Sequence, residues 1–269
     1  RLVQVVEIGR ALGAGVAVKW NAVYPALGVA VLVVATEVRR IRETPPRTRA
    51  TVAAAALGRC LVCVVVIPLT VYAASWLPDM LARGMSVREL VARHAAMYRY
   101  HAAITETRWY ASAWWQWPLD LRPIWLYQGT VDLPTGRIAS VVTMGNPVVW
   151  WSGLVAVPVL AAAVLLRRDR AAALILLALA TAWLPWALAA RKLTFIYHFL
   201  PATPFLALGL ARCLELLVAR FPRTRPVPVV VATAAAAAFA IYLPLLTGMS
   251  IPRAYAEALR WLSTWIFFA

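Results

Sequence analysis

Residues Val227 to Leu246 read VPVVVATAAAAAFAIYLPLL, twenty residues without a charge. A helix needs about 20 predominantly apolar residues to cross the hydrocarbon core of a bilayer. A second uncharged run extends from Ile138 to Leu166. One such helix fits inside a soluble protein, but several do not. These runs therefore predict a chain embedded in a membrane.

The composition agrees, since 63% of the residues are hydrophobic and 14% are charged, against roughly 25% charge in a soluble domain. Backbone polar groups in lipid must be satisfied within the segment, so each span is expected to be a helix. Predominantly apolar runs predict spans at Ala11 to Thr36, Thr51 to Trp76, Ile138 to Leu166, Ala171 to Ala189, Thr194 to Val218 and Val227 to Leu246. The predicted fold is all-α, a polytopic bundle of about six transmembrane helices.

The formal net charge of +16 would suggest a nucleic-acid partner if it lay on one soluble face. Instead the arginines gather in alternate short connections, so no nucleic-acid partner is expected. These groups are Arg39, Arg40, Arg42, Arg47 and Arg49, then Arg167, Arg168 and Arg170, then Arg220, Arg223 and Arg225. Because Lys and Arg are in excess in cytoplasmic loops, these connections are predicted to be cytoplasmic.

The same alternation places residues 77–137 outside the cytoplasm as one large loop. This segment is rich in Trp and Tyr, which argues against disorder. Within it, Val87 to Tyr100 is predicted to form an amphipathic helix along the membrane interface. Leu90, His94 and Met97 recur there at helical spacing.

Aromatic residues and arginines are concentrated in YHAAITETRWYASAWWQWPLDLRPIWLY, residues 100–127. An interfacial belt of Trp and Tyr is one interpretation. Aromatic faces also pack on sugar rings, and Arg108 and Arg122 are suited to bidentate phosphate binding. A sugar joined to a phospholipid needs both kinds of contact.

This string resembles the extracytoplasmic loop of bacterial protein O-mannosyltransferases, which typically has Tyr-His, then Thr-His-Pro-Tyr-x-Ser, Trp-x-Trp-Pro-Leu and Arg-Pro. Lys19-Trp20, GNPVVWW at residues 145–151 and RKLTFIYHFLPATPF at residues 191–205 resemble the same family in the same order. One departure is Arg108-Trp109, which stands where the family usually has His-Pro. A family role for that histidine therefore cannot be carried over.

The resemblance implies a lipid-sugar glycosyltransferase of the GT-C type. Such an enzyme moves mannose from polyprenyl-phosphate-mannose to Ser or Thr hydroxyls of secreted or membrane proteins, with inversion at the anomeric carbon. The lipid-linked sugar is a substrate, and no cofactor is evident. The chain begins at Arg1 without a signal peptide and is expected to be the C-terminal part, residues 1–269, of a larger enzyme. The family's catalytic carboxylate is expected upstream, so no catalytic residue is assigned.

Cationic side chains are needed to stabilise the charge that develops on the departing phosphate. The candidates for donor phosphate binding are Lys19, His101, Arg108, Arg122, Arg191 and His198. The candidates for the sugar and acceptor side are Tyr110, Ser112, Trp114, Trp115, Trp117 and Tyr197. No Asp-x-Asp pair or His/Cys cluster suggests a metal site.

Two of these residues have open alternatives. Lys19 is the only charge in its predicted span, so it is either functional or extended toward the interface. His198, near the outer end of its predicted span, is either a phosphate contact or a packing residue. Asn146, before Pro147, is predicted to cap the third span.

Two other functions stay open beside the mannosyltransferase. One is a related transferase that moves another polyprenyl-linked sugar to lipid or polysaccharide. The other is a non-catalytic membrane subunit or lipid-carrier transporter, although the matching inverted halves of many transporters are not evident. The expected location is a cell membrane, the bacterial cytoplasmic membrane rather than the endoplasmic reticulum. Whether the protein dimerises is left open.

Overall fold

The computed structural model describes residues 2–104, 106, 108–129, 133–191 and 193–268. The chain divides into two compact units between His101 and Ala102, and each is described by itself. Six helical segments among the described residues are long and apolar enough to cross a membrane. They are Trp20–Arg42, Pro46–Arg83, Pro147–Arg167, Arg170–Leu188, Ile196–Arg220 and Pro222–Thr247. The predicted number of spans is confirmed.

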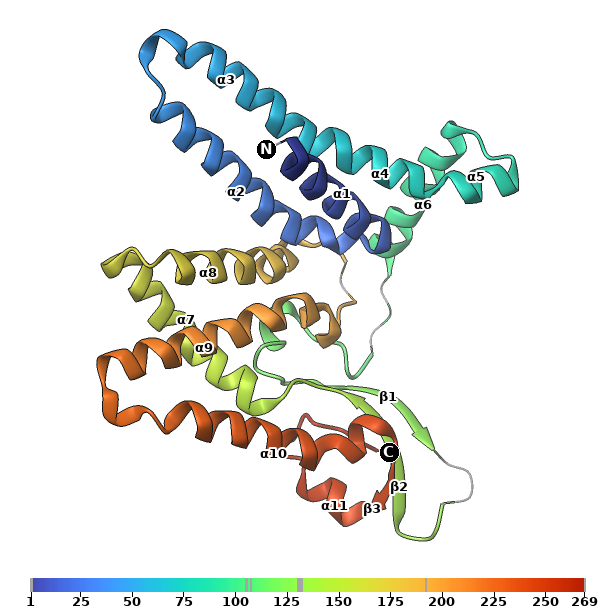
Figure 1. Ribbon diagram of the computed structural model, residues 1–269. Helices are drawn as coiled ribbons and strands as arrows, with labels where there is room; N and C mark the ends of the chain where they lie inside the picture. The colour runs from blue at the N-terminus through green and yellow to red at the C-terminus, as the bar shows by residue number, and fades with distance from the viewer. Residues whose placement is uncertain (1, 105, 107, 130–132, 192, 269) are drawn as a thin grey trace. The chain divides into compact units, whose positions relative to one another are not determined.

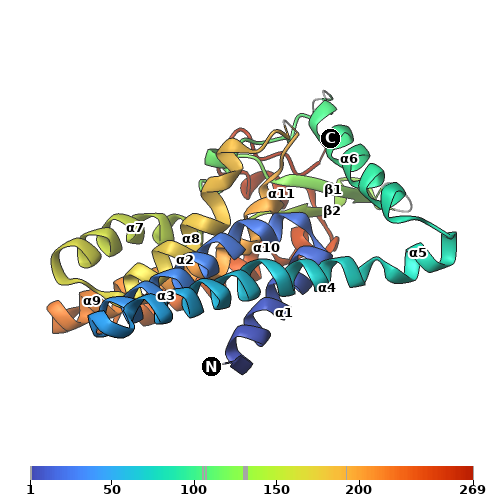
Figure 2. The ribbon, with the colours of Figure 1, turned by 90° about the horizontal axis from the view of Figure 1, so that it is seen from above.

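The N-terminal unit is helical throughout its regular elements (Figure 1). It contains α1 (Leu2–Val18), η1 (Trp20–Ala22), α2 (Val23–Arg42), α3 (Pro46–Leu61), η2 (Val62–Val66), α4 (Ile67–Ser75), α5 (Leu77–Arg83) and α6 (Val87–Ala103). Helix α3 continues through η2 into α4 as one long rod, which Figure 2 shows from above. Helix α1 packs closely on this rod: the glycine at position 13 leaves no room for a side chain, since an added Cβ would lie 2.7 Å from the Pro68 carbonyl oxygen.

The first predicted span, Ala11 to Thr36, is wrong at its start. The helix α1 ends at Val18, and Lys19 has an extended backbone (φ −158°, ψ 128°) before η1 begins. The candidate span is Trp20–Arg42, so Lys19 lies at the corner between two helices and not inside a span. Hydropathy depends on composition and not on the direction of the chain. An apolar run in which one helix ends and another begins is therefore predicted as a single helix.

One half-buried charge pair joins α2 to α3. The guanidinium of Arg59 donates to both carboxylate oxygens of Glu37, at 2.7 and 2.6 Å. A charge that leaves water is costly unless it is paired and hydrogen-bonded. This bidentate pair therefore allows both residues to lie within segments that are otherwise apolar.

The C-terminal unit combines helices with a small sheet (Figure 1). It contains η3 (Trp114–Gln116), β1 (Ile124–Gly129), β2 (Arg137–Thr143), α7 (Pro147–Arg167), α8 (Arg170–Trp183), η4 (Leu184–Leu188), η5 (Ile196–Ala202), α9 (Thr203–Arg220), η6 (Pro222–Thr224), α10 (Val227–Thr247), β3 (Ser250–Pro252) and α11 (Arg253–Ala258). Helices α7 and α9 pack at close range, since a Cβ at Gly153 would lie 2.6 Å from Cγ of Leu206. Small residues commonly bring membrane helices together in this way.

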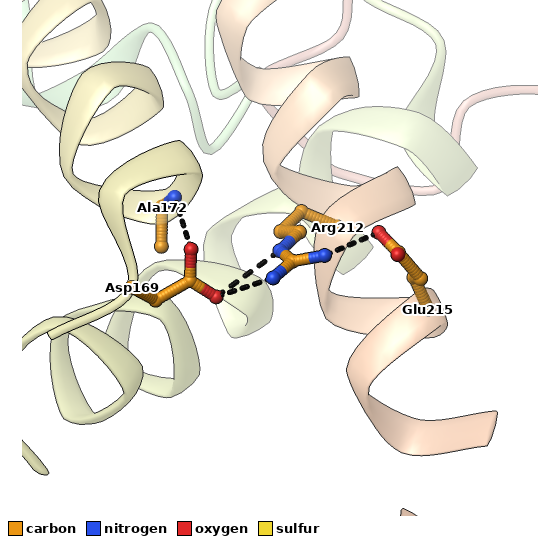
Figure 3. Close-up of polar contacts among 4 residues, drawn as sticks. All are labelled: Asp169, Ala172, Arg212 and Glu215. Carbon is orange, nitrogen blue, oxygen red and sulfur yellow. Dashed lines mark hydrogen bonds and ion pairs between the residues drawn. The ribbon is translucent and has the colours of Figure 1, made fainter. Parts of the chain in front are cut away.

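Polar contacts fix the turn between α7 and α8 to α9 (Figure 3). Asp169 caps α8 by accepting from the Ala172 N–H, and its other oxygen accepts from Arg212 Nη2 at 2.6 Å. Arg212 also donates to Glu215, as the three-residue spacing allows. The Ala172 N–H and then Arg212 hold the pKa of Asp169 below its usual range.

The third predicted span, Ile138 to Leu166, is also wrong at its start. Residues Arg137–Thr143 form β2, the central strand of an antiparallel sheet with the order β1-β2-β3. Helix α7 begins only at Pro147, and the Asn146 side chain accepts from the Val148 and Val149 N–H groups. The predicted cap at Asn146 is therefore confirmed. Ile, Val and Thr fit a half-buried strand as well as a membrane helix, so composition does not separate the two.

The sheet packs on the end of α10 and on the C-terminal segment. The shared core is Ile138, Val142, Tyr242, Leu245, Ile251, Ala256, Leu259, Trp265, Phe267 and Phe268. The predicted helical membrane bundle is confirmed, and the structure adds this small sheet, which the sequence does not predict. It forms because residues 137–143 and 250–252, more than a hundred positions apart, are paired by the fold.

Candidate functional site

Two stretches that carry the family resemblance are joined in the C-terminal unit. The Ser112 N–H donates to the Thr194 carbonyl at 2.9 Å, and the Thr194 hydroxyl donates to the Ser112 carbonyl at 2.7 Å. Both residues are buried. The aromatic loop (residues 108–123) is therefore fixed to the segment that leads into η5.

A cluster of rings holds this junction. Trp117 is fully buried, donates its indole N–H to the Ser112 carbonyl and stacks on the imidazole of His198 (centroids 5.7 Å apart, 19° between planes). Trp186 contacts the same imidazole edge-on, and Tyr197 stacks on it at 4.3 Å. Such geometries add to the stabilisation from burial. The cluster makes the junction a rigid support.

His198 is 1% exposed, and its Nδ1 faces the backbone of Phe195. This buried position is the one expected of a packing residue, and the phosphate contact stays a prediction. Tyr197, beside it, is half-buried. Ser112 and Trp117 likewise hold the loop in place rather than face solvent.

The rim of the loop carries the exposed aromatic surface. Trp115 is 50% exposed, and Tyr110 is half-buried against Phe195. Trp114 accepts the indole N–H of Trp183 at its carbonyl, 2.9 Å away. Of these three rings Trp115 is the exposed one, and contact of the group with a sugar or a polypeptide stays a prediction.

The arginines of the site differ in how their charge is balanced. Arg122 is half-buried and donates Nη1 to the carbonyls of Ala111 (3.2 Å) and Trp109 (3.3 Å). Arg191 donates to the Leu193 carbonyl at 2.8 Å. Neither guanidinium has a carboxylate within ion-pair distance among the described residues, whereas Arg108 pairs with Glu106. Carbonyls orient a guanidinium without neutralising it, so Arg122 and Arg191 keep a positive charge for an anion.

Lys19 and His101 belong to the N-terminal unit. Lys19 is exposed at the corner before η1, and His101 is exposed on α6, with its ring against Tyr100. Lys192, next to Arg191, lies outside the described residues. Within the described residues no three His, Cys, Asp or Glu side chains gather as a metal site would require.

Asp120 is a buried acid within the aromatic loop that the sequence does not single out. Both of its carboxylate oxygens are buried without a hydrogen-bond partner among the described residues. Burial raises the pKa of Asp120 to about 8, and the nearby Gly145 N–H offsets part of that rise. The carboxyl group is therefore mainly neutral at pH 7.

Three neighbouring carbonyls hold the turn that contains this acid. Trp151 of α7 donates to the Leu119 carbonyl, Trp265 donates to the Asp120 carbonyl, and Thr264 donates to the Leu121 carbonyl. Trp265 and Thr264 lie beyond the last span, where sequence patterns give no sign of a role. Of the four rings in the cluster, Trp117, Tyr197 and His198 are predicted from the sequence as site residues, and Trp186 is not.

Comparison with known proteins agrees with this arrangement. Residues 86–265 match the family model described as the C-terminal four TMM region of protein-O-mannosyltransferase. A polyprenol-phosphate-mannose--protein mannosyltransferase of Mycobacterium tuberculosis is 27% identical, over 96% of this chain and 56% of the relative. The protein of the same name from Mycolicibacterium smegmatis is 26% identical, over 96% of this chain and 57% of the relative. The chain thus spans about half the length of these curated relatives.

The fold is also similar to a solved structure, the S. cerevisiae protein O-mannosyltransferase Pmt1-Pmt2 complex bound to the sugar donor. The TM-score is 0.56 at 22% identity, over 68% of this chain and 27% of that chain. At this identity the likeness concerns the fold alone. The six candidate spans and the match over residues 86–265 make the chain a multi-pass membrane protein of the protein O-mannosyltransferase family, and it includes that family's C-terminal membrane region.

Proposed function

We propose that the chain is the C-terminal part of a polyprenyl-phosphate-mannose-dependent protein O-mannosyltransferase. The complete enzyme would transfer mannose to Ser or Thr hydroxyls of proteins on the outer side of a bacterial cytoplasmic membrane. The names of the mycobacterial relatives support the donor, and their source supports the bacterial membrane. The resemblance of the aromatic loop to the extracytoplasmic loop of this family supports Ser or Thr hydroxyls as the acceptor and the outer side of the membrane as the place of transfer.

The proposal rests mainly on the surroundings of the Arg122 guanidinium. Its guanidinium is oriented by two carbonyls, has no described carboxylate partner and sits on a loop fixed by buried rings. A preorganised cation of this kind stabilises charge that grows on a leaving group. The departing group in the proposed reaction is a polyprenyl phosphate, and Arg122 would bind its oxygens.

The roles proposed for the other site residues follow from how exposed their side chains are. Arg191 would supply a second positive charge, and Trp115 and Tyr110 would offer faces to the sugar or to the acceptor chain. The acceptor hydroxyl must lose its proton to a positioned carboxylate. Asp120 is 0% exposed and does not reach the hydroxyl of an acceptor chain, so we expect the base outside the described residues of this chain.

Arg122→Gln tests the proposal in the full-length enzyme. Glutamine removes the charge, and its shorter side chain also gives up the hydrogen bonds that Arg122 Nη1 donates to the Ala111 and Trp109 carbonyls. A charge-assisted hydrogen bond contributes about 1.5–3 kcal/mol, so we expect the KM for polyprenyl-phosphate-mannose to rise by roughly tenfold to a hundredfold. Membrane insertion should change little, and a thermal melt of the variant shows whether the loop is still folded without these two hydrogen bonds.

Radiolabelled mannose transfer to a Ser/Thr-rich peptide measures this effect at donor concentrations below KM. Arg223→Ala is the control, because Arg223 is exposed in η6 and is not part of the proposed site. Unchanged transfer by Arg122→Gln would refute the phosphate role. Transfer of another polyprenyl-linked sugar, with none of mannose, would favour the related transferase.

A further inference from the structure

The helical hairpin of α5 and α6 is held in one shape by local contacts. Gly84 ends α5 in the left-handed region (φ 62°), where glycine is favoured. Ser86 and Glu89 then cap α6 reciprocally, since the Glu89 carboxylate accepts from the Ser86 N–H and the Ser86 hydroxyl oxygen accepts from the Glu89 N–H. Asp79 of α5 accepts from Arg93 of α6 at 2.5 Å, so the orientation of α6 is defined.

One face of α6 is attached to the membrane helices of its own unit. His94 Nδ1 lies 2.7 Å from the Leu90 carbonyl, which can only accept, so this nitrogen carries the ring hydrogen. His94 Nε2 then accepts from the Tyr72 hydroxyl (2.6 Å), whose oxygen accepts from the Trp20 indole (2.7 Å). The rings of Trp20 and Trp76 lie against the same imidazole.

This attachment uses the stripe that the sequence assigns to the membrane interface. Leu90, His94 and Met97 are half-buried within the unit and are not available to lipid. A different apolar stripe is free, formed by Val87, Val91 and Tyr98, which are 68%, 63% and 59% exposed. Their spacing of four and seven residues places them on one side of the helix.

Two arginines lie along the border of the free stripe. Arg88 and Arg99 follow Val87 and Tyr98 by one residue each, so both lie on the same flank. Both are exposed, and neither has a carboxylate within ion-pair distance among the described residues. An apolar stripe flanked by cations is the pattern of a helix that lies in a lipid headgroup layer.

The membrane is within reach of this face. The helical run Pro46–Arg83 has 38 residues, and at about 1.5 Å per residue it is much longer than the roughly 30 Å of hydrocarbon. Its end must therefore emerge at a surface, and α6 folds back from that end (Figure 1). Helix α6 is not among the candidate spans.

We propose that Val87, Val91 and Tyr98 insert into the headgroup layer of the membrane, where Arg88 and Arg99 bind the phosphates of anionic phospholipids. The phospholipid surface is the occupant because the face continues directly from a spanning helix. Its charge is complementary to that surface, and each Lys or Arg near an anionic leaflet adds to attraction. This surface goes beyond the proposed transfer reaction and does not depend on it.

Spin labels at two positions of α6 test the insertion in the full-length enzyme in phosphatidylcholine/phosphatidylglycerol liposomes. Cys60, Cys63 and Cys213 are first replaced by Ala, and a single label is introduced by Val91→Cys or by Ala96→Cys. Ala96 is an exposed residue on the opposite side of the helix. We expect oxygen to relax the Val91 label more strongly than a water-soluble nickel chelate does, and the reverse at Ala96. Equal nickel accessibility at the two sites would overturn the insertion.

A second measurement tests the phosphate contacts. Adding phosphatidylglycerol to phosphatidylcholine should lower the nickel accessibility of the Val91 label at least about twofold, by strengthening attraction of the arginines. The double variant Arg88→Gln/Arg99→Gln should lose this response, and the control Arg170→Gln/Arg223→Gln should keep it. A response that survives in the α6 variant would overturn the assignment of anionic lipid.

Discussion

The carboxyl group of Asp120 gives the aromatic loop a specific dependence on pH. Its pKa of about 8 in the folded protein lies above the usual value near 3.9, so folding takes up a proton between these values. Stability from this group is fully present below about pH 4 and is lost as the pH rises toward 8. The loss totals roughly 6 kcal/mol, at about 1.4 kcal/mol per pH unit.

Asp120→Asn removes the ionisation while it keeps the shape of the side chain. We expect the melting temperature of the native protein to fall between pH 5 and pH 8, and that of Asp120→Asn to stay flatter. Intrinsic tryptophan fluorescence in detergent would follow both transitions. Asp169→Asn is the matched control, because the lowered pKa of Asp169 gives stability that is lost as pH falls, not as it rises. Parallel curves for native and Asp120→Asn would contradict the buried neutral acid.

Sequence alone gave no reason to choose Asp120 over the other carboxylates. It stands two residues before Arg122 and would ordinarily be expected to face water. Its left-handed backbone (φ 54°) turns it inward, and Trp265, from the far end of the chain, encloses the turn. The contact with Trp265 is tertiary, and no local sequence pattern predicts it. Asn146 was predictable because its cap depends only on the next few residues.

Helix packing in the C-terminal unit depends on the absence of a side chain at Gly153. An alanine Cβ there would lie 2.6 Å from Cγ of Leu206 on α9, closer than real contacts allow. We expect Gly153→Ala to lower the free energy of unfolding by about 1–3 kcal/mol, as overpacking does. Gly58→Ala is the matched control, because no atom lies within 4 Å of its added Cβ. There we expect a gain of about 0.5–1 kcal/mol from helix propensity.

Thermal unfolding in detergent would separate these two alanines. A Gly153→Ala protein as stable as the Gly58→Ala protein would mean that α7 and α9 separate without cost, contrary to their close contact. Both substitutions change helix propensity by the same amount, so a difference in their stability measures helix packing. It reports the contact that Gly153 makes with α9, which Gly58 does not make with any neighbour.

The sequence predicted whole elements well where apolar composition decides them. The last three spans begin and end within a few residues of their predicted limits. The corner at Lys19 and strand β2 were missed, because hydropathy cannot detect a reversal of direction or the pairing of Arg137–Thr143 with two distant strands. The site followed the same rule. Its aromatic and cationic stretches were found, but the contacts that fix them, such as Thr194 with Ser112, were not.

At the scale of the molecule, the arginine-rich turns predict which side of the membrane each end of the C-terminal unit occupies. The turns after α7 and α9 carry Arg167, Arg168, Arg170, Arg220, Arg223 and Arg225. Cytoplasmic placement of these turns puts the sheet and the aromatic loop on the outer side. In cells that express the full-length enzyme without its native cysteines, a membrane-impermeant maleimide should therefore label Leu126→Cys, which replaces a 59% exposed residue of β1. Arg223→Cys should react only after permeabilisation. The opposite pattern would place the aromatic loop in the cytoplasm, where a donor and acceptor on the outer side cannot reach it, and the proposed reaction would fail together with the orientation.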